Sequence, residues 1–493
     1  MKYTGDAYRN FNIWLKKLKP MISNNLSEHK YFNFETTISR VFQIITEKTS
    51  EEYNIGFKNG NNWENNVFGP LKIYKNKLTI SVKSRILFNC LFILESTYLF
   101  LLLVKGIFKT GESPKKYSVL FEPPITDLTE FKNFLTNTQI PGLNKLDYLV
   151  IKKRYFRASR GLNPKILKNP WTFIVTKNFS VSSRIKICCD FLAYTINSLV
   201  YLNKCNLNVL LYRDLPSSFL VNLLNKKKQI LNLFITNSSF QSQPLWLNGL
   251  NGVKFKSHMI WYSQNFIPKF HKGESKQSYL PGSDQIRVDY HWLWTKKFGD
   301  LITKLNPKSK YHAINSIMFY SNKIQNLKIK NRVVIFDVIP IESKNNVFFG
   351  AINYYYTKKT ISKFVRDIVE SVETINRHEK ENIEVVLKTK RPQNKNHNKE
   401  YFHFLNELKK KYTFFKFANS NSNIYRLISE AFISFSVPFT STAEVAYELK
   451  TPTYFYDSSN SILPNYETNH IPLLYEGKEL IKVIKEAKIK NLT

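Results

Sequence analysis

Short apolar runs alternate with longer amphipathic stretches over the last third of the chain. Helical spacing of apolar residues covers 360–377, 400–410, 424–431, 443–449 and 478–488. An apolar run rich in β-branched and aromatic residues precedes each stretch, at 333–340, 384–392, 413–418, 432–438 and 452–457. Five strand–helix units in succession predict a doubly wound parallel sheet, which binds ligands beyond the carboxyl ends of its strands.

A second set of apolar runs occupies the middle of the chain and predicts another α/β domain. These seven expected strands lie at 117–124, 147–151, 172–176, 208–212, 232–236, 258–265 and 291–295. We therefore expect two Rossmann-like domains, over residues 111–302 and 332–493. A polar linker over 303–331 separates them, and residues 1–110 form a helical accessory region.

One apolar run, Ile86–Val104, approaches the length that a membrane-spanning helix needs. It contains Asn89 and Glu95, and a carboxylate is costly inside a bilayer. Basic residues flank the run at Lys83, Arg85, Lys105 and Lys109. The pattern predicts a helix that lies on the inner face of the cytoplasmic membrane, with an ordinary buried helix as the alternative.

The chain carries 73 Lys and Arg against 37 Asp and Glu, a formal charge of +36. A protein this basic attracts polyanions, such as nucleic acid, anionic lipid or phosphorylated substrates. An AT-rich coding sequence also accounts for much lysine and asparagine. Because no RNA-recognition, zinc-finger or helix-turn-helix signature accompanies the charge, we expect no specific nucleic-acid partner. A non-enzymatic polyanion-binding protein is one alternative function.

The four cysteines have neither metal-ligand nor disulfide spacing, and we expect buried, reduced thiols. The first 20 residues lack the apolar core and cleavage site of a signal peptide. Both features are typical of a cytoplasmic protein. There is no Asp-x-Asp, Walker or Gly-x-Gly-x-x-Gly motif, and glycine is scarce at 15 residues. We expect no metal and no cofactor.

Three hydroxyl residues, Thr440, Ser441 and Thr442, stand between an apolar strand and the next helix. Ser441 and Glu444 have the spacing of a capping box, which explains them structurally. The functional interpretation is a phosphate site, because a helix amino terminus presents unpaired amides and a positive dipole end. Both can hold if Ser441 caps the helix while Thr440 and Thr442 bind phosphate.

Cationic residues follow the expected strand at 384–387: Lys388, Lys390 and Arg391. They could neutralise a phosphate at the carboxyl edge of the sheet, or form a solvated loop. Asp337 follows the first strand of the same domain. It lies either at the mouth of the cleft or as a cap on a local turn.

The string Ser436–Thr442 resembles the signature of the polysaccharide biosynthesis proteins named for a PFTS motif, here Pro438 to Ser441. With the helix that follows, it is similar to the donor half of GT-B glycosyltransferases. Among these, bacterial sialyltransferases and Kdo transferases hold the phosphate of a CMP-sugar in a serine-rich turn. The resemblance implies donor contacts for Thr440, Ser441, Thr442 and Glu444.

The same resemblance aligns Lys388, Lys390 and Arg391 with a Lys-x-His-Pro motif, with Arg391 in the place of the histidine. Donor contact is therefore implied, but proton transfer at that position is not. A second departure is Lys450-Thr451-Pro452, where related domains place a glycine before the proline. We expect the preceding helix to end without the usual left-handed glycine.

An inverting sugar transfer needs a general base to accept the proton of the acceptor hydroxyl. Asp214 and Glu122 are the candidates, because each follows an expected strand at its carboxyl end. The sequence thus predicts a metal-independent glycosyltransferase of surface-polysaccharide biosynthesis. Its partners are a nucleotide-sugar donor, with CMP-linked sugars as one candidate, and a glycan or lipid-linked glycan acceptor. A CDP-glycerol-type polymer phosphotransferase is the alternative enzyme.

Overall fold

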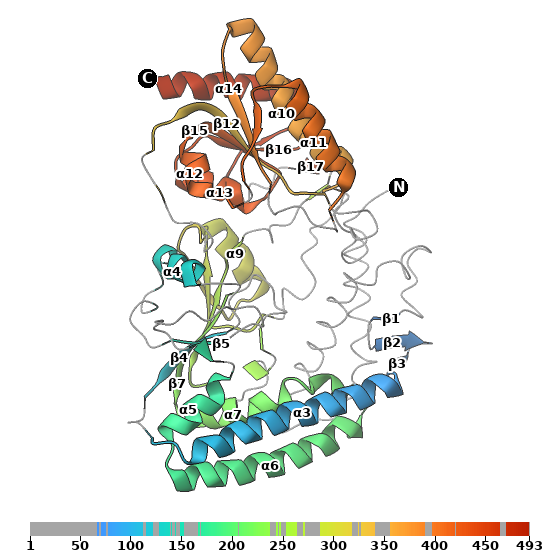
Figure 1. Ribbon diagram of the computed structural model, residues 1–493, viewed down its shortest axis with the longest axis vertical. Coiled ribbons are helices and arrows are strands. Elements are labelled where there is room, and N and C mark those ends of the chain that lie inside the picture. Colours follow the sequence, from blue (N-terminus) through green and yellow to red (C-terminus); the bar gives the residue numbers. More distant parts are fainter. Residues whose placement is uncertain are drawn as a thin grey trace.

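The computed structural model contains two parallel α/β sheets, one above the other in Figure 1, with helices packed on them. The structure describes residues 67–68, 71–74, 77–111, 115–121, 128–138, 140, 143, 148–151, 166–167, 169–205, 207–236, 243–244, 246–247, 253–263, 270–271, 286–317, 324, 327–340, 355–389, 397–419, 421–463 and 470–492.

The first sheet has seven parallel strands in the order β6-β5-β4-β7-β8-β10-β11. In chain order they are β4 (Tyr117–Phe121), β5 (Tyr148–Ile151), β6 (Ile166–Leu167), β7 (Ile230–Ile235), β8 (Lys256–Ile260), β10 (Tyr290–Leu293) and β11 (Lys310–Ala313). The order is that of a Rossmann sheet, 3-2-1-4-5-6, with a seventh strand added at the edge.

The second sheet repeats this order with six parallel strands, β14-β13-β12-β15-β16-β18. They are β12 (Lys330–Phe336), β13 (Glu384–Lys388), β14 (Phe415–Phe417), β15 (Ala431–Ser436), β16 (Thr453–Tyr456) and β18 (Leu473–Leu474). The expected fold class, two Rossmann-like sheets, is therefore confirmed. In each sheet the order reverses beside the first strand, and in the second sheet that switch point lies between β12 and β15.

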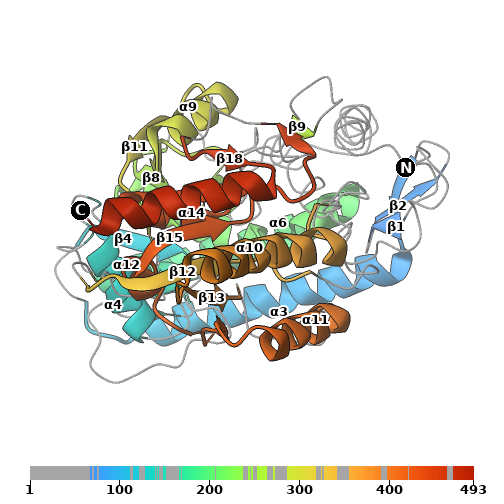
Figure 2. The same cartoon turned by 90° about the horizontal axis from the view of Figure 1, so that it is seen from above.

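Helices cover the second sheet on both faces (Figure 1), and Figure 2 shows the helices of one of these faces from above. They are α10 (Lys358–Glu379), α11 (Lys399–Lys411), α12 (Ile424–Ser429), α13 (Ser441–Glu448) and α14 (Gly477–Leu492). α10 packs against α14 on one face, and α12 packs against α13 on the other. All five occur where the apolar spacing predicts helices.

Two expected strands of the first domain are helical. Residues 172–176 belong to α5 (Pro170–Asn178), because the Asn169 side chain accepts a hydrogen bond from Thr172 N (3.1 Å) and Pro170 occupies the first turn. Residues 208–211 form a short 3-10 helix, η1 (Asn208–Leu211), between α6 and α7. The sheet is completed instead by β6 and by β11, which lies within the stretch expected to be a linker.

Helices also surround the first sheet. They are α3 (Val82–Ile107), α4 (Leu128–Asn137), α5, α6 (Val181–Lys204), α7 (Leu215–Lys226) and α9 (Lys296–Leu305). A small antiparallel sheet of β1 (Val67–Phe68), β2 (Leu71–Tyr74) and β3 (Lys77–Ile80) precedes α3. By length and composition alone, α3 and α6 could each cross a membrane.

The two domains touch through backbone and side chains. β9 (Phe270–His271) of the first pairs antiparallel with β17 (Ile462–Leu463) of the second. Ser316 N donates to Glu448 Oε2 (2.8 Å), and the Ser316 hydroxyl donates to the same oxygen. Beyond the carboxyl end of β8, Ser263 Oγ lies 3.2 Å from Ser441 Oγ at the start of α13. The carboxyl edges of the two sheets therefore face each other.

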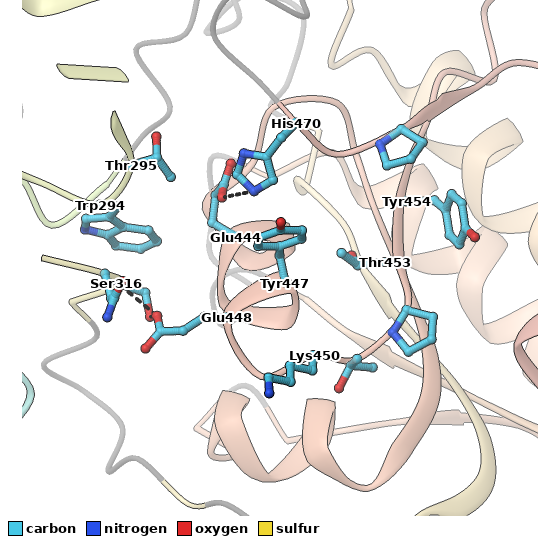
Figure 3. Close-up of a pocket in the computed structure, with 14 residues that line it drawn as sticks. Trp294, Thr295, Ser316, Glu444, Tyr447, Glu448, Lys450, Thr453, Tyr454 and His470 are labelled. Atoms are coloured by element: carbon cyan, nitrogen blue, oxygen red, sulfur yellow. Dashed lines mark hydrogen bonds and ion pairs between the residues drawn. The ribbon is translucent and has the colours of Figure 1, made fainter. Parts of the chain in front are cut away.

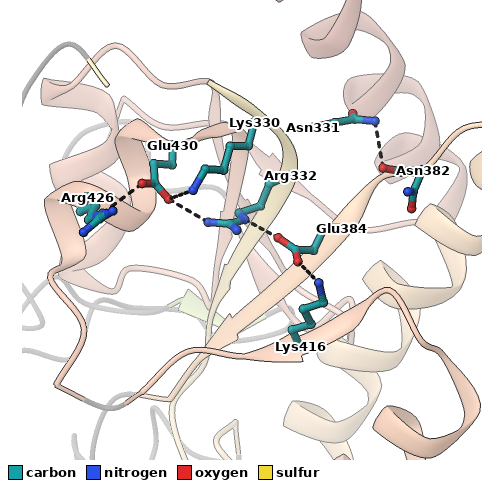
Figure 4. A network of polar contacts seen from close by, with 8 residues as sticks. All are labelled: Lys330, Asn331, Arg332, Asn382, Glu384, Lys416, Arg426 and Glu430. Carbon is teal, nitrogen blue, oxygen red and sulfur yellow. Dashed lines mark hydrogen bonds and ion pairs between the residues drawn. The ribbon is translucent and has the colours of Figure 1, made fainter. Parts of the chain in front are cut away.

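The opposite, amino ends of the second sheet carry a network of ion pairs (Figure 4). Arg332 donates to Glu384 Oε2 (2.6 Å) and Glu430 Oε2 (3.0 Å), and Lys330 donates to Glu430 (2.8 Å). Lys416 pairs with Glu384 (2.5 Å). Burial raises the pKa of both glutamates, but the hydrogen bonds from these cations outweigh it and leave each pKa below its usual value.

Candidate functional site

The chain turns sharply after β15, at the switch point of the second sheet. Thr440 N donates to Val437 O (3.2 Å), with Pro438 and Phe439 between them, as in a type II turn. Phe439 has φ 60°, a left-handed conformation that costs a non-glycine residue about 1–2 kcal/mol. Its buried ring packs edge-on against Phe455, with 5.4 Å between centroids. Burial of this ring holds the turn in place.

The three hydroxyl residues lie at the amino terminus of α13, but the expected capping box is wrong. Thr440 occupies the cap position, and its hydroxyl donates to Val437 O (2.9 Å) rather than capping an amide. Ser441 is the first helical residue, so Glu444 stands one position too far along for a capping box. The Thr442 hydroxyl lies 3.0 Å from Ser436 Oγ. The hydroxyls thus cluster at the helix terminus, and the Thr440 side chain does not cap its backbone amides.

The helix ends as its sequence requires, in spite of the missing glycine. Lys450 takes the left-handed conformation with φ 59°. Its N–H donates to Tyr447 O (3.0 Å), and Thr451 N donates to Ala446 O (3.0 Å), which together form a Schellman motif. A lysine therefore fills the position at which related domains use glycine.

Asp337 and Lys388 lie at the carboxyl ends of adjacent strands, β12 and β13, and both are buried. The Tyr401 hydroxyl donates to Asp337 Oδ2 (2.6 Å). Burial lowers the pKa of Lys388, while the nearby Asp337 carboxylate raises it in part. The alternative of a solvated loop is thus wrong for Lys388, which ends β13. Lys390 and Arg391 lie outside the described residues.

A pocket of about 790 Å³ lies beside α13, between the two domains (Figure 3). Trp294, Thr295 and Ser316 line it from the first domain. The second domain contributes α13 with the Tyr447 ring, which packs against the His470 ring at 4.0 Å between centroids. The volume falls in the range of small-molecule sites.

The polar end of this pocket holds a buried carboxyl and an imidazole. Glu444 Oε2 lies 3.4 Å from His470 Nε2, whereas Glu444 Oε1 is buried with no hydrogen-bond partner among the described residues. Burial raises the pKa of Glu444 to about 7, although Lys297 acts in the opposite direction. Burial also lowers the pKa of His470. The pair can therefore accept hydrogen bonds from a ligand, or hold a proton, near neutral pH.

No pattern along the chain pointed to His470 or Ser263 as site residues. His470 reaches Glu444 only because β18 and its preceding residues return beside β16 and α13. One signal was available: a glutamate on the apolar face of a short helix, Ala443 to Ala446, is buried and needs a partner.

The premise for Asp214 as the general base is wrong. Asp214 follows η1 rather than a strand and occupies the cap position of α7, without a side-chain capping bond in the described structure. Glu122 lies outside the described residues. His258 lies in the middle of β8, where burial lowers its pKa to about 4 and its Nδ1 accepts from Trp292 Nε1 (3.1 Å). These contacts suit a structural histidine.

No group of three or more His, Cys, Asp or Glu side chains that could hold a metal ion occurs among the residues that the structure describes. The site is built instead from hydroxyls, helix amides, one buried lysine and a carboxyl–imidazole pair. Such groups bind anions and sugar or ribose hydroxyls.

Comparison with known proteins gives one family. The family model described as "Polysaccharide biosynthesis PFTS motif protein" matches residues 195–484, which is more than half of the chain. The match covers the turn after β15, the pocket and most of both sheets. A search of curated proteins finds no significant match.

Several solved structures share a distant likeness with the chain. Accessory secretory proteins 1, 2 and 3 of Streptococcus pneumoniae match at 11% identity and a TM-score of 0.31, over 57% of this chain and 52% of that one. Sucrose-phosphate synthase from Thermosynechococcus elongatus matches at 8% identity and a TM-score of 0.40, over 76% of this chain and 90% of that one. The wall teichoic acid polymerase TagF matches at 10% identity and a TM-score of 0.36, over 83% of this chain and 90% of that one. The chain spans about half the length of the first of these. Likeness this low carries no argument about function.

Proposed function

Because the chain belongs to the polysaccharide biosynthesis PFTS motif family, we propose that it is a glycosyltransferase that uses a nucleotide-activated sugar donor. The acceptor is a glycan or lipid-linked glycan of a surface polysaccharide. One observation carries the proposal: a hydroxyl-rich turn and a helix amino terminus stand at the switch point of a Rossmann sheet, where such sheets bind nucleotides.

The donor phosphate is assigned to the amino terminus of α13. The amides of Thr442 and Ala443 and the Thr442 hydroxyl supply hydrogen bonds to its oxygens, and the helix dipole favours its negative charge. The Thr440 hydroxyl, which donates to Val437 O in this structure, joins them by turning from that carbonyl to the phosphate. Lys388 adds a cation from the next strand but one, with Lys390 and Arg391 expected beyond it. As the glycosidic bond to the leaving phosphate breaks, these groups stabilise the charge that develops on it.

A hydroxyl-bearing part of the substrate is assigned to the pocket beside α13. The buried Glu444 Oε1 lacks a partner in the described structure, and a buried acceptor of this kind is normally satisfied. A sugar or ribose hydroxyl would donate to it, with His470 held behind the carboxyl. The exposed Tyr447 ring offers an apolar face on which a ring can pack, and the almost fully buried Trp294 contributes to the wall of the pocket. Glu122 stays the sequence-based candidate for the general base, whereas Asp214 does not follow a strand and is not proposed.

Thermal denaturation with and without CMP, CDP and UDP at millimolar concentration tests the donor site. A nucleotide that binds only the folded protein raises the melting temperature. We expect Thr442→Val to lower the affinity for that nucleotide by roughly ten- to a hundredfold, the value of one hydrogen bond to a charged group. Thr440→Ala should lower it by less, because the Thr440 hydroxyl must first give up its bond to Val437 O. Mass spectrometry of the products from CMP-, CDP- and UDP-linked donors then identifies the transferred group.

Ser180→Ala is the matched control. The Ser180 side chain caps α6 in the first domain, where it accepts from Ser183 N, so the variant loses a hydroxyl at a helix terminus remote from the site. It should lose stability and keep nucleotide binding unchanged. If no nucleotide stabilises even the parent protein, the glycosyltransferase assignment fails. Transfer of glycerol phosphate instead of a sugar would favour the CDP-glycerol alternative.

A further inference from the structure

Helix α3 presents a line of large apolar side chains to solvent. Leu87, Leu94 and Leu101 recur every seven residues and are 53%, 65% and 59% exposed. Ile86 and Ile93 flank them and are also exposed. Seven residues make nearly two full helical turns, so these side chains form one continuous stripe.

Helix α6 carries a second stripe of the same kind. Val181, Ile185, Leu192, Ile196 and Val200 are four or seven residues apart and about half to two-thirds exposed. Cys189 falls on the same stripe, and Cys90 falls on that of α3; both are exposed, so the expectation of buried thiols is wrong for these two. Scattered exposed apolar residues are ordinary, but two continuous stripes are not.

The two stripes lie on helices that run antiparallel, side by side (Figure 1). At one end Asn89 and Asn203 exchange side-chain hydrogen bonds of 3.0 and 3.3 Å. At the other end the buried Arg184 of α6 donates to the carbonyls of Gly106 (2.9 Å) and Lys109 (2.5 Å). These contacts fix the pair as a unit, on the side of the first domain away from the second.

The opposite face of each helix belongs to the core of the first domain. On α3 it carries Phe92, Leu99 and Leu103, and on α6 it carries Ile187 and Phe191, all buried in one cluster. Gly106 of α3 lies so close to α5 that a Cβ atom there would stand 2.2 Å from Thr176 Oγ1. Crossing a bilayer would pull these faces out of the core, so the pair is built to lie on a surface.

Charged residues are arranged around the stripes in a way that fits an anionic surface. Lys83 and Lys204 lie at one end of the helix pair, and Lys105 and Lys186 lie toward the other, all exposed. Glu95 is one residue from Leu94, about 100° around the helix, and so lies off the line of the α3 stripe. A second copy of this chain would bring lysines against lysines at both ends, whichever way it docked.

We propose that the paired stripes of α3 and α6 form a membrane-docking face, which inserts into the headgroup region of an anionic bilayer while the lysines contact the lipid phosphates. Apolar side chains enter the interface and cations hold it to acidic lipid, as in other interfacial helices. Docking this way turns the distant end of the first domain to the membrane and leaves the site between the domains above it. The proposal is independent of the proposed function.

Flotation of the full chain with phosphatidylglycerol and with phosphatidylcholine vesicles tests this face. We expect binding to the anionic vesicles, weakened by salt. The variant Leu94→Glu with Ile196→Glu should lower vesicle binding by roughly tenfold or more, because two exposed apolar side chains that would enter the bilayer are lost and two negative charges replace them. Lys83→Gln with Lys105→Gln should lower it about fivefold for each lysine on anionic vesicles only.

Matched controls lie on the second domain. Ile489→Glu with Ile329→Glu changes two exposed isoleucines away from the face, and Lys410→Gln with Lys478→Gln changes two exposed lysines. Both controls should bind vesicles like the parent. Unchanged melting temperatures verify that every variant is folded.

Three results would overturn the proposal. The first is binding that survives Leu94→Glu with Ile196→Glu. The second is protein that resists extraction from vesicles at alkaline pH, which indicates a spanning helix. The third is a parent protein that binds no vesicles but forms a dimer without lipid, as measured by sedimentation velocity, while the double variant is a monomer. The face would then join two copies of the chain.

Discussion

The two ends of the second sheet use charge in opposite ways. At the amino ends of β12, β13 and β15, each carboxylate is paired with cations and its pKa is lowered. Beyond the carboxyl end of β15, Glu444 is buried beside a neutral imidazole and its pKa is raised. One end is satisfied by the protein itself, and the other keeps hydrogen-bonding capacity for a ligand. The same strands thus separate stability from binding.

The carboxyl end depends on apolar packing for its stability, and Phe439→Ala should show this most strongly. Both residues meet the same left-handed backbone strain, so the substitution isolates the loss of the buried ring. We expect a loss of about 3–4 kcal/mol in the free energy of unfolding, measured in urea. The loss should be the same in 0.1 M and 1 M salt. A cost below about 1 kcal/mol would show that the ring does not hold the turn.

The raised pKa of Glu444 predicts a pH dependence that one substitution removes. A carboxyl whose pKa rises from 4.5 to about 7 on folding contributes stability that is complete below pH 4.5 and lost as the pH rises through 7. Glu444→Gln should therefore stabilise the protein at pH 8, on the order of 2–3 kcal/mol, and leave it unchanged at pH 4. Chemical denaturation at the two pH values measures this.

Glu407→Gln is the control for that experiment, because Glu407 is exposed on α11 and should have little effect at either pH. A Glu444→Gln variant that is less stable than the parent at pH 8 would mean that the ionised carboxylate is satisfied in the folded protein. The contrast between the two ends of the sheet would then fail.

Arg332→Ala should destabilise the protein, the reverse of Glu444→Gln, and the change in the free energy of unfolding should be smaller. Its two glutamates keep other cations and the cluster is partly exposed, so we expect a loss of about 1–2 kcal/mol at pH 7. The lowered pKa of Glu384 and Glu430 gives stability that is present above pH 4.5 and lost as the pH falls below it. The difference in the free energy of unfolding between the parent and the variant should therefore become smaller on acidification and in 1 M salt. If this difference does not change, the ion pairs are not what Arg332→Ala removes from the stability of the protein.

Local patterns predict the second domain better than the first because its strands and helices are long and regularly spaced. All five expected strands and helices there are present, and among the described residues only the two-residue strands β17 and β18 were missed. In the first domain, the β-branched run 172–176 suggested a strand. The start signal Asn169-Pro170 and burial between α3 and α7 make it a helix. Edge strands such as β6 carry too few residues to show any period.

The candidate site divides in the same way. The turn at Thr440 to Thr442 was predictable, because strand, hydroxyl cluster and helix follow one another in the chain. The Glu444–His470 pair and the contact between Ser263 and Ser441 were not, since each joins segments brought together only by the sheet order. The exposed stripe of α6 has helical spacing that the sequence contains, but its exposure depends on which face the core uses.

The pairing of β9 with β17 limits how the two domains can move. A two-residue ladder of backbone hydrogen bonds, Ile462 with His271 and Leu463 with Phe270, resists sliding far more than side-chain contacts do. The bonds from Ser316 to Glu448 make a second fixed point. These two points define an axis about which the second domain can rotate once the third contact between the domains, Ser263 with Ser441, is broken. The cleft would then open and close by a hinge rotation of the second domain, and a substrate would enter from the side away from the rotation axis.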